Sequence, residues 1–165
     1  MEQRTEVFKN IMRNYPTGVT IITTLDNDHN PTGLTANSFA SVSIDPLMIL
    51  WCIDKRSNSY EVFKNCKRFA VNILSGNQKE ECNVFASRKV KDRFSKVDWN
   101  LSDYDLPIIE NAFAELECDK VDQIDAGDHL ILIGKVLDLK ESDHIPMLYH
   151  NRNLGPVPES INASM

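Results

Sequence analysis

The 165-residue sequence lacks the glycine-rich motifs by which many proteins hold nucleotide phosphates. It contains neither G-x-G-x-x-G nor G-x-x-x-x-G-K-[ST], so a nucleotide site would have to be built without a Rossmann fold or a P-loop. No Ser-His-Asp order and no paired carboxylates stand out. The sequence therefore offers no candidate residues for hydrolytic or acid–base catalysis.

Long apolar runs and closely spaced cysteines are also missing. No run approaches the roughly 18 apolar residues of a membrane span, and segment 1–6 has no apolar signal core. The four cysteines are widely spaced, with no C-x-x-C and no histidine at zinc spacing. We therefore expect a cytoplasmic protein with reduced thiols and no metal site.

Charge and length narrow the class further. The formal net charge of −6 argues against a general nucleic-acid-binding protein and against attraction to an anionic membrane, so any phosphate site must be a local cluster of cations. The length, without a repeat or a linker, predicts one domain over 1–165. Its core should run from about 8 to 150, with an extended or partly disordered tail over 151–165.

The hydrophobic pattern predicts a mainly β protein with a few helices. Turn-forming residues join two pairs of predicted strands into hairpins, and strands and helices do not alternate as in repeated βαβ units. Both observations favour an antiparallel closed or split barrel over a doubly wound sheet. The apolar run 47–53 is typical of a strand covered on both faces, and the stretch from 95 to 107 is expected to be irregular. Helices are expected over 2–14, 60–65 and about 78–85, and strands over 18–24, from 33, and over 47–53, 68–74, 111–124 and 128–139.

An unusual row of small and polar residues occupies the strand-like stretch 33–43. Hydroxyl and amide side chains alternate there with glycine and alanine, which keep the surface low enough for a flat ligand to lie against the backbone. Packing alone rarely requires such a row, although a polar edge strand that runs into a loop would also explain it. The residues concerned are Gly33, Thr35, Ala36, Asn37, Ser38, Ala40, Ser41 and Ser43.

Two short basic segments are candidates for an anion site. Two cations and a hydroxyl come together at the start of a predicted helix in Lys55, Arg56 and Ser57. A phosphate is the anion that such a group would be expected to bind. Arg88 is a second candidate for the same anion. The alternative for each is an ordinary solvated charge.

One histidine and one tyrosine are placed where they could meet a ligand. His129 follows Asp128 at the tip of a predicted hairpin, so its ring could donate a hydrogen bond or take up a proton near neutral pH, with Asp128 orienting it. Tyr149 could stack on a ligand or bond to it. A hairpin-tip histidine without function and a half-buried packing tyrosine are the alternatives.

Taken together, these stretches resemble the short-chain flavin reductases, which include the reductase components of two-component flavin monooxygenases. The resemblance runs from about Phe8 to Tyr149 and rests on the order of its landmarks. These are Pro16-Thr17-Gly18-Val19, Gly33 to Phe39, Ser41-Val42-Ser43, Asp45-Pro46, Phe69 to Leu74, Phe85-Ala86, Asp92-Arg93-Phe94, Gly127-Asp128-His129 and Ile133-Gly134.

The resemblance implies an antiparallel split β-barrel that binds FMN or FAD and takes electrons from NADH or NADPH. It places the nicotinamide near His129 and Tyr149, with His129 as the candidate catalytic residue, and it implies a homodimer and a monooxygenase or other electron acceptor as partner. The flavin ring would lie on Leu34, Thr35, Ala36, Asn37, Ser38, Ala40 and Ser41, and its phosphate end would meet Lys55, Arg56, Ser57, Ser87 and Arg88.

The sequence departs from the family in two places. Leu47 stands where a second proline is common, and 149–153 replaces the usual aromatic and glycine-containing ending. The second departure keeps an alternative open, a non-enzymatic FMN-binding electron carrier without a nicotinamide site. An inert barrel that serves as an interaction module is the third hypothesis.

Overall fold

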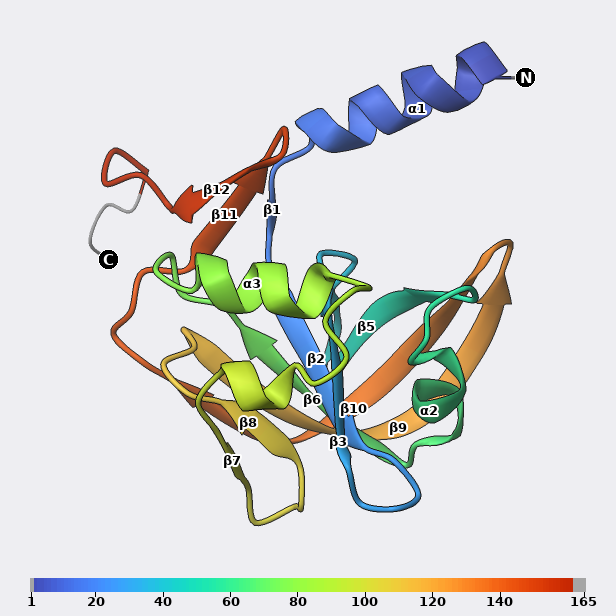
Figure 1. The fold of residues 1–165 in the computed structure, drawn as a ribbon, viewed down its shortest axis with the longest axis vertical. Helices are drawn as coiled ribbons and strands as arrows, with labels where there is room; N and C mark the ends of the chain where they lie inside the picture. The colour runs from blue at the N-terminus through green and yellow to red at the C-terminus, as the bar shows by residue number, and fades with distance from the viewer. Residues whose placement is uncertain (1, 162–165) are drawn as a thin grey trace.

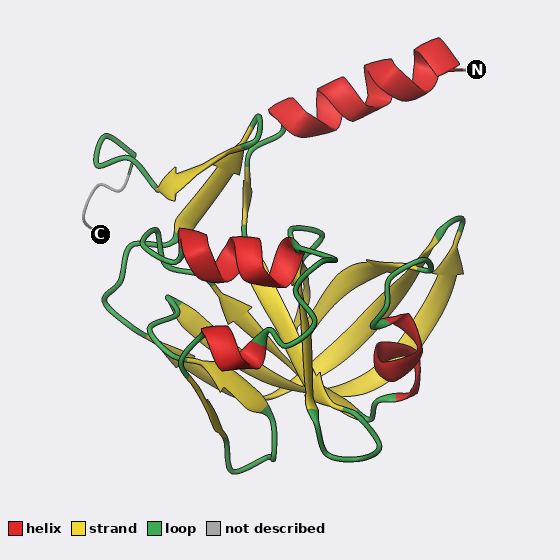
Figure 2. Ribbon diagram, viewed as in Figure 1, coloured by secondary structure: helices red, strands yellow, loops and turns green. Residues whose placement is uncertain are grey.

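The computed structural model describes residues 2–161, and the mainly β prediction is confirmed there (Figures 1 and 2). Three α-helices and one 3-10 helix accompany twelve strands in this part of the chain. The helices are α1 (Glu2–Asn14), α2 (Tyr60–Asn65), α3 (Lys79–Ala86) and η1 (Phe94–Lys96). The strands are β1 (Thr17–Gly18), β2 (Thr20–Leu25), β3 (Pro31–Ala36), β4 (Ala40–Ile44), β5 (Leu47–Asp54), β6 (Arg68–Ile73), β7 (Trp99–Leu101), β8 (Pro107–Ile109), β9 (Ala114–Ala126), β10 (His129–Glu141), β11 (Met147–His150) and β12 (Asn153–Pro156).

A seven-stranded antiparallel sheet forms the body of the molecule, in the order β3-β2-β6-β9-β10-β5-β4. Both predicted hairpins are present: β2 pairs with β3, and the long strands β9 and β10 pair from His129 and Ala126 to Glu141 and Ala114. Because β3 and β4 end the order, the segment that links them connects the two edges of the sheet.

Strands β2 and β6 are covered on both faces, and the prediction that 47–53 would be such a strand is wrong. Ile22 packs into one core cluster with Trp51, whereas its neighbour Ile21 packs into a second cluster with Phe85. In β5, by contrast, burial alternates along the strand, because its second face has only partial cover. Helix α3 and strand β8 contact β2 and supply its extra cover.

Trp51 lies at the centre of the first cluster. Its ring meets Phe63 of α2 and Phe69 of β6 edge to face, with centroids 5.0 and 5.9 Å apart, and all three side chains are fully buried. Helix α2 is thereby fixed against the outer part of the sheet, next to the turn that carries residues 55–59.

Two segments hold more structure than the sequence predicts. The stretch from 95 to 107 contains the end of η1, strand β7 and the first residue of β8, with which β7 pairs, in place of an irregular loop. In the predicted tail, β12 pairs with β11, and β11 pairs with β1 to form a three-stranded sheet. These strands have two to four residues each, too few for a periodic pattern to show. Residues 162–165 of the predicted tail lie outside the described residues.

Helix α1 begins and ends as predicted, but it projects from the body and buries none of its residues (Figure 1). Its last turn is attached to the three-stranded sheet, where the amide of Asn151 donates to the carbonyl of Arg13 at 2.8 Å. The apolar side chains Val7, Phe8 and Ile11 are therefore each more than half exposed.

Candidate functional site

A polar cleft of about 290 Å³ lies where the end of β3, the end of β5, the end of α3 and the tip of the β9–β10 hairpin meet. Four stretches that are far apart in the sequence thus form one site. The cleft is lined by Leu34, Thr35, Ala36, Asn37, Ser38, Cys52, Ile53, Asp54, Ser57, Asn58, Phe85, Ala86, Arg88, Arg93 and His129.

The stretch 34–38 forms one wall of this cleft. Its hydroxyl groups are used within the protein: Thr35 Oγ1 donates to the carbonyl of Cys82 in α3 at 2.7 Å. Ser38 Oγ donates to the carbonyl of Cys52 at 2.9 Å and accepts from the Cys52 amide at 3.0 Å. Since Cys52 belongs to β5, Ser38 ties the link between β3 and β4 across to the opposite side of the sheet.

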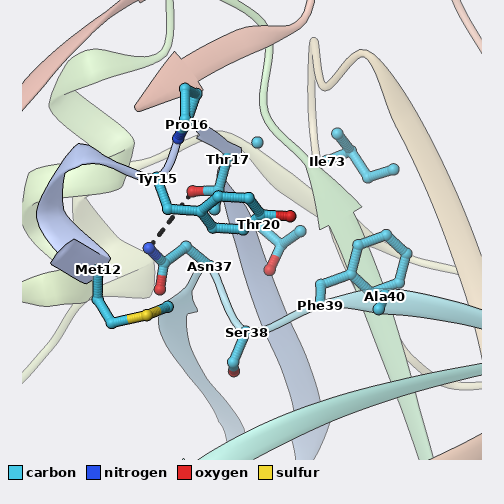
Figure 3. Close-up of a pocket in the computed structure, with 11 residues that line it drawn as sticks. Met12, Tyr15, Pro16, Thr17, Thr20, Asn37, Ser38, Phe39, Ala40 and Ile73 are labelled. Atoms are coloured by element: carbon cyan, nitrogen blue, oxygen red, sulfur yellow. Dashed lines mark hydrogen bonds between the residues drawn. The ribbon is translucent and has the colours of Figure 1, made fainter. Parts of the chain in front are cut away.

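A second cavity of about 710 Å³ adjoins the cleft and shares Asn37 and Ser38 with it. Figure 3 shows Asn37 beside Thr17, to which its Nδ2 donates at 3.4 Å, and shows Tyr15 on the same side of the cavity. Ala40 lines this second cavity, whereas Ser41 lines neither space. Asn37 is exposed between the two spaces, which places its amide within reach of a ligand in either one.

Lys55 and Arg56 do not line the cleft, and each is engaged by a carboxylate. Lys55 Nζ lies 2.6 Å from Asp125 Oδ1 and also donates to the carbonyl of Gly127 at 2.9 Å. Arg56 is held by both oxygens of Asp54, which lines the cleft; the closer contact is 2.8 Å, and these bonds hold the pKa of Asp54 well below its usual range. Of this predicted cluster only Ser57 lines the cleft.

Two other arginines bring positive charge to the cleft. Arg88, predicted from the sequence, lines it and has no hydrogen bond or ion pair within residues 2–161. Arg93 belongs to the family landmark Asp92-Arg93-Phe94, and the sequence does not predict its place at the cleft because its partner Gly33 is distant in the sequence. Ser87 stands beside the cleft, where its carbonyl accepts from Arg93 at 2.9 Å.

His129 lines the cleft from the hairpin tip. Its Nδ1 lies 2.7 Å from Asp128 Oδ1, and this bond lowers the pKa of Asp128. With Nδ1 engaged in this way, Nε2 is the ring nitrogen left for a ligand. Lys55 holds the same tip through Gly127 and Asp125, so it supports the position of His129.

Tyr149 lies on β11 opposite Thr17 and packs beside the second core cluster. It lines neither the cleft nor the adjoining cavity. Thr17 lines the second cavity, which puts Tyr149 one strand away from that space.

Within residues 2–161, no three side chains of His, Cys, Asp or Glu gather in a way that could hold a metal ion. No helix in that range is long and apolar enough to cross a membrane.

Fold and cleft together define a mainly β protein whose polar cleft is lined by a stretch of small residues and by two arginines without carboxylate partners within residues 2–161. Comparison with known proteins identifies the family: the model described as "Flavin reductase like domain" matches residues 12–158, and the chain belongs to this family.

Three similar proteins illustrate the relationship. A "Probable flavin reductase" of Rhizobium meliloti is 47% identical over 128 residues, 78% of this chain and 41% of that protein. The reductase component of the flavin-dependent trigonelline monooxygenase of Acinetobacter baylyi is 48% identical over 122 residues, 74% of this chain and 39% of that protein. This chain therefore spans about 40% of the length of these two curated relatives. The NADH:FAD oxidoreductase SgcE6 of Streptomyces globisporus, solved with NAD and FAD fragments, has a TM-score of 0.87 and 31% identity, and the match covers 95% of this chain and 93% of that one.

Proposed function

We propose that this protein is an NAD(P)H-dependent flavin reductase that transfers a hydride from NADH or NADPH to FMN or FAD. The observation that carries the proposal is the cleft itself, where a low wall of small residues ends at two arginines without carboxylate partners. A flat ring with an anionic tail fits this arrangement. Family membership and the similarity to NADH:FAD oxidoreductase SgcE6 point the same way.

The residues of the cleft would bind and orient the flavin without a catalytic base. Bound flavin would supply the hydride-accepting chemistry, which is why the protein needs no nucleophile. The wall 34–38 would hold the ring flat, and Asn37 would contact it between the two cavities. His129 would present Nε2 to the ring, with Asp128 fixing the orientation of the imidazole through Nδ1. The adjoining cavity offers the nicotinamide a place next to the flavin, with Tyr149 behind its wall.

The remaining predicted site residues would act from outside the cleft. Lys55 would support the hairpin tip, Arg56 would hold Asp54, and Ser87 would anchor the segment that carries Arg88. Ala40 would line the nicotinamide side, and Ser41 would hold the edge where β4 pairs with β5.

We propose the split barrel as the finer description of the fold, with residues 1–165 as a single domain. Ser38 supports it, because its bonds to Cys52 close the gap between the two edges of the seven-stranded sheet. A homodimer would cover the edge strand β4, whose Ile44 is 88% exposed. A monooxygenase component would receive the reduced flavin, as the naming of the Acinetobacter relative suggests. The cytoplasm is the compartment we propose, because the four cysteines are not in disulfide bonds and the cytoplasm keeps thiols reduced.

The reductase is tested by aerobic turnover. Oxidation of NADH or NADPH by catalytic amounts of protein should depend on added FMN or FAD and continue for many turnovers, because oxygen reoxidises the released flavin. Oxidation that stops after one equivalent, or that ignores added flavin, would count against the proposal.

Ser38→Ala is expected to lower both stability and flavin affinity. Loss of its two bonds leaves the amide and carbonyl of Cys52 without their partner and frees the wall of the cleft. We expect unfolding to be easier by about 1–3 kcal/mol and FMN affinity to fall about tenfold. Urea unfolding and a titration of FMN fluorescence measure the two effects.

Ser95→Ala provides the matched control. Its exposed hydroxyl makes only a local bond to the carbonyl of Asp92, outside the cleft. If the two alanine variants behave alike, the role assigned to Ser38 is wrong.

A further inference from the structure

The large cavity beside the cleft is lined by no arginine, lysine or histidine from residues 2–161. Its volume of about 710 Å³ lies in the range that holds a drug-sized ligand, so it has room for more than a nicotinamide ring. NADH and NADPH carry a pyrophosphate beyond the nicotinamide ribose, and NADPH adds a phosphate on the 2′-hydroxyl of its adenosine. Any cation that meets these phosphates would lie at the edge of the cavity.

Two arginines come together at one edge of this cavity. Arg13 lies in the last turn of α1, between Met12 and Tyr15, which both line the cavity. Arg152 lies in the turn between β11 and β12, and the amide of its neighbour Asn151 donates to the carbonyl of Arg13 at 2.8 Å. Figure 1 shows the end of α1 beside this turn. The fold thus joins two basic residues from opposite ends of the chain.

The turn itself does not require an arginine. Asn151 and Arg152 form the two-residue turn of a hairpin, and both have a positive φ, of 47° and 66°. Asparagine and glycine favour such a turn, whereas arginine does not. Arg152 also belongs to 149–153, where the sequence departs from the usual family ending. An interaction with a ligand would account for an arginine at this position.

The charges of the two arginines are not balanced within the protein. Neither guanidinium has a hydrogen bond or an ion pair within residues 2–161. Glu6, a carboxylate of the same helix as Arg13, is bonded to Lys9 at 2.8 Å. Arg13 is only partly exposed, which strengthens its attraction to an anion. Guanidinium groups bind phosphate through two parallel hydrogen bonds, so a pair of them at one edge suits a phosphate group.

We propose that Arg13 and Arg152 bind the phosphate groups of the nicotinamide donor at the edge of this cavity. The inference rests on the proposed function and deepens it, because it names the residues that hold the donor while its ring lies beside the flavin. The cavity walls, and not the arginines, would orient the ring. The pair should therefore affect the binding of the donor and leave the hydride transfer itself unchanged.

The test compares three donors at saturating FMN: NADH, NADPH and reduced nicotinamide riboside, which has the ring and its ribose but no phosphate. In the double variant Arg13→Gln with Arg152→Gln, KM should rise about tenfold or more, with kcat unchanged, for each donor whose phosphate is bound. A rise for NADPH alone would identify the 2′-phosphate, and an equal rise for NADH and NADPH the pyrophosphate. The kinetics with the riboside should not change. Arg13→Lys with Arg152→Lys, which keeps both charges, should retain part of the affinity.

Arg4→Gln is the matched control, because it removes the same charge from the far end of the same helix and does not line the cavity. It should leave all three donors unaffected. The inference is overturned if the double glutamine variant keeps the wild-type KM for both NADH and NADPH, or if the riboside is weakened as much as they are.

If the double variant does not fold, the salt dependence of the wild-type protein decides. Salt should raise KM for the phosphate-bearing donor and not for the riboside, and equal dependence would overturn the inference. Wild-type protein that oxidises none of the three donors in the presence of FMN would count against the proposed function instead.

Discussion

Gly33→Val is expected to abolish flavin binding and to destabilise the protein. A Cβ atom at this position would lie 2.8 Å from Cε1 of Phe85 and 3.1 Å from the carbonyl oxygen of Ile22, closer than packed atoms allow. Phe85 is buried and meets Phe94 edge to face at 5.0 Å, so its ring has little freedom to move aside. Strand β3 and helix α3 must then separate.

The cleft lies between these two elements. Phe85 lines it, and the carbonyl of Gly33 is the acceptor for Arg93, so separation would move both the wall 34–38 and the arginine bonded to β3. Overpacking of this kind costs about 1–3 kcal/mol, and more for a branched side chain against a buried ring. We expect Tm to fall by about 4–10 °C and FMN affinity to fall by more than a hundredfold.

Thermal unfolding and an FMN titration measure these effects. Gly155→Val is the control, because a Cβ at Gly155 would meet no atom within 4 Å. If the Gly33 variant melts and binds FMN like the Gly155 variant, the close approach of β3 to α3 does not shape the cleft.

Asn72→Leu is expected to cause the largest loss of stability. The fully buried amide of Asn72 donates to the carbonyl of Ile21 at 3.0 Å and to Thr23 Oγ1 at 3.2 Å, and its oxygen accepts from the amide of Ile109 at 2.9 Å. It thereby joins β6 to β2 and β8. Leucine would fill the space and leave buried polar groups unpaired, at about 1–3 kcal/mol for each.

We therefore expect a loss of about 3–5 kcal/mol in the free energy of unfolding, a large part of the total for a domain of this size. Urea unfolding measures it. Asn65→Leu is the control, since the exposed Asn65 bonds only to Glu61 within its own helix. A loss below about 1 kcal/mol in the Asn72 variant would mean that this network does not hold β8 on the sheet.

Local patterns predicted most of the large elements. Helix α1 and the two hairpins follow from amphipathic spacing and turn residues, which act over a few positions. Which strands are covered on both faces could not be predicted in this way. The apolar run 47–53 and the threonine-rich β2 differ in what packs on them, namely α3 and β8, and this depends on distant parts of the chain.

The cleft, too, could be predicted only in the parts that depend on local sequence. The wall 34–38 could be predicted, because small polar residues in a strand are unusual wherever the strand lies. The prediction that Lys55 belongs to an anion site could not foresee its salt bridge. Its partner Asp125 lies 70 residues further along the chain and neutralises its charge at the hairpin tip. Arg93 was missed for the opposite reason, since its partner Gly33 lies 60 residues earlier and offers only a backbone carbonyl. A cluster of cations in a sequence therefore indicates an anion site only after its carboxylate partners are known.

The account depends most on electron transfer from nicotinamide to flavin at this cleft. The direct measurement is the visible absorbance of the protein with FMN, without oxygen, before and after NADH and then NADPH are supplied. We expect the oxidised-flavin band to disappear within the turnover time of the enzyme, and the donor that removes it faster to be the physiological one. Bound flavin that stays oxidised with both donors would contradict the reductase and would support the electron carrier.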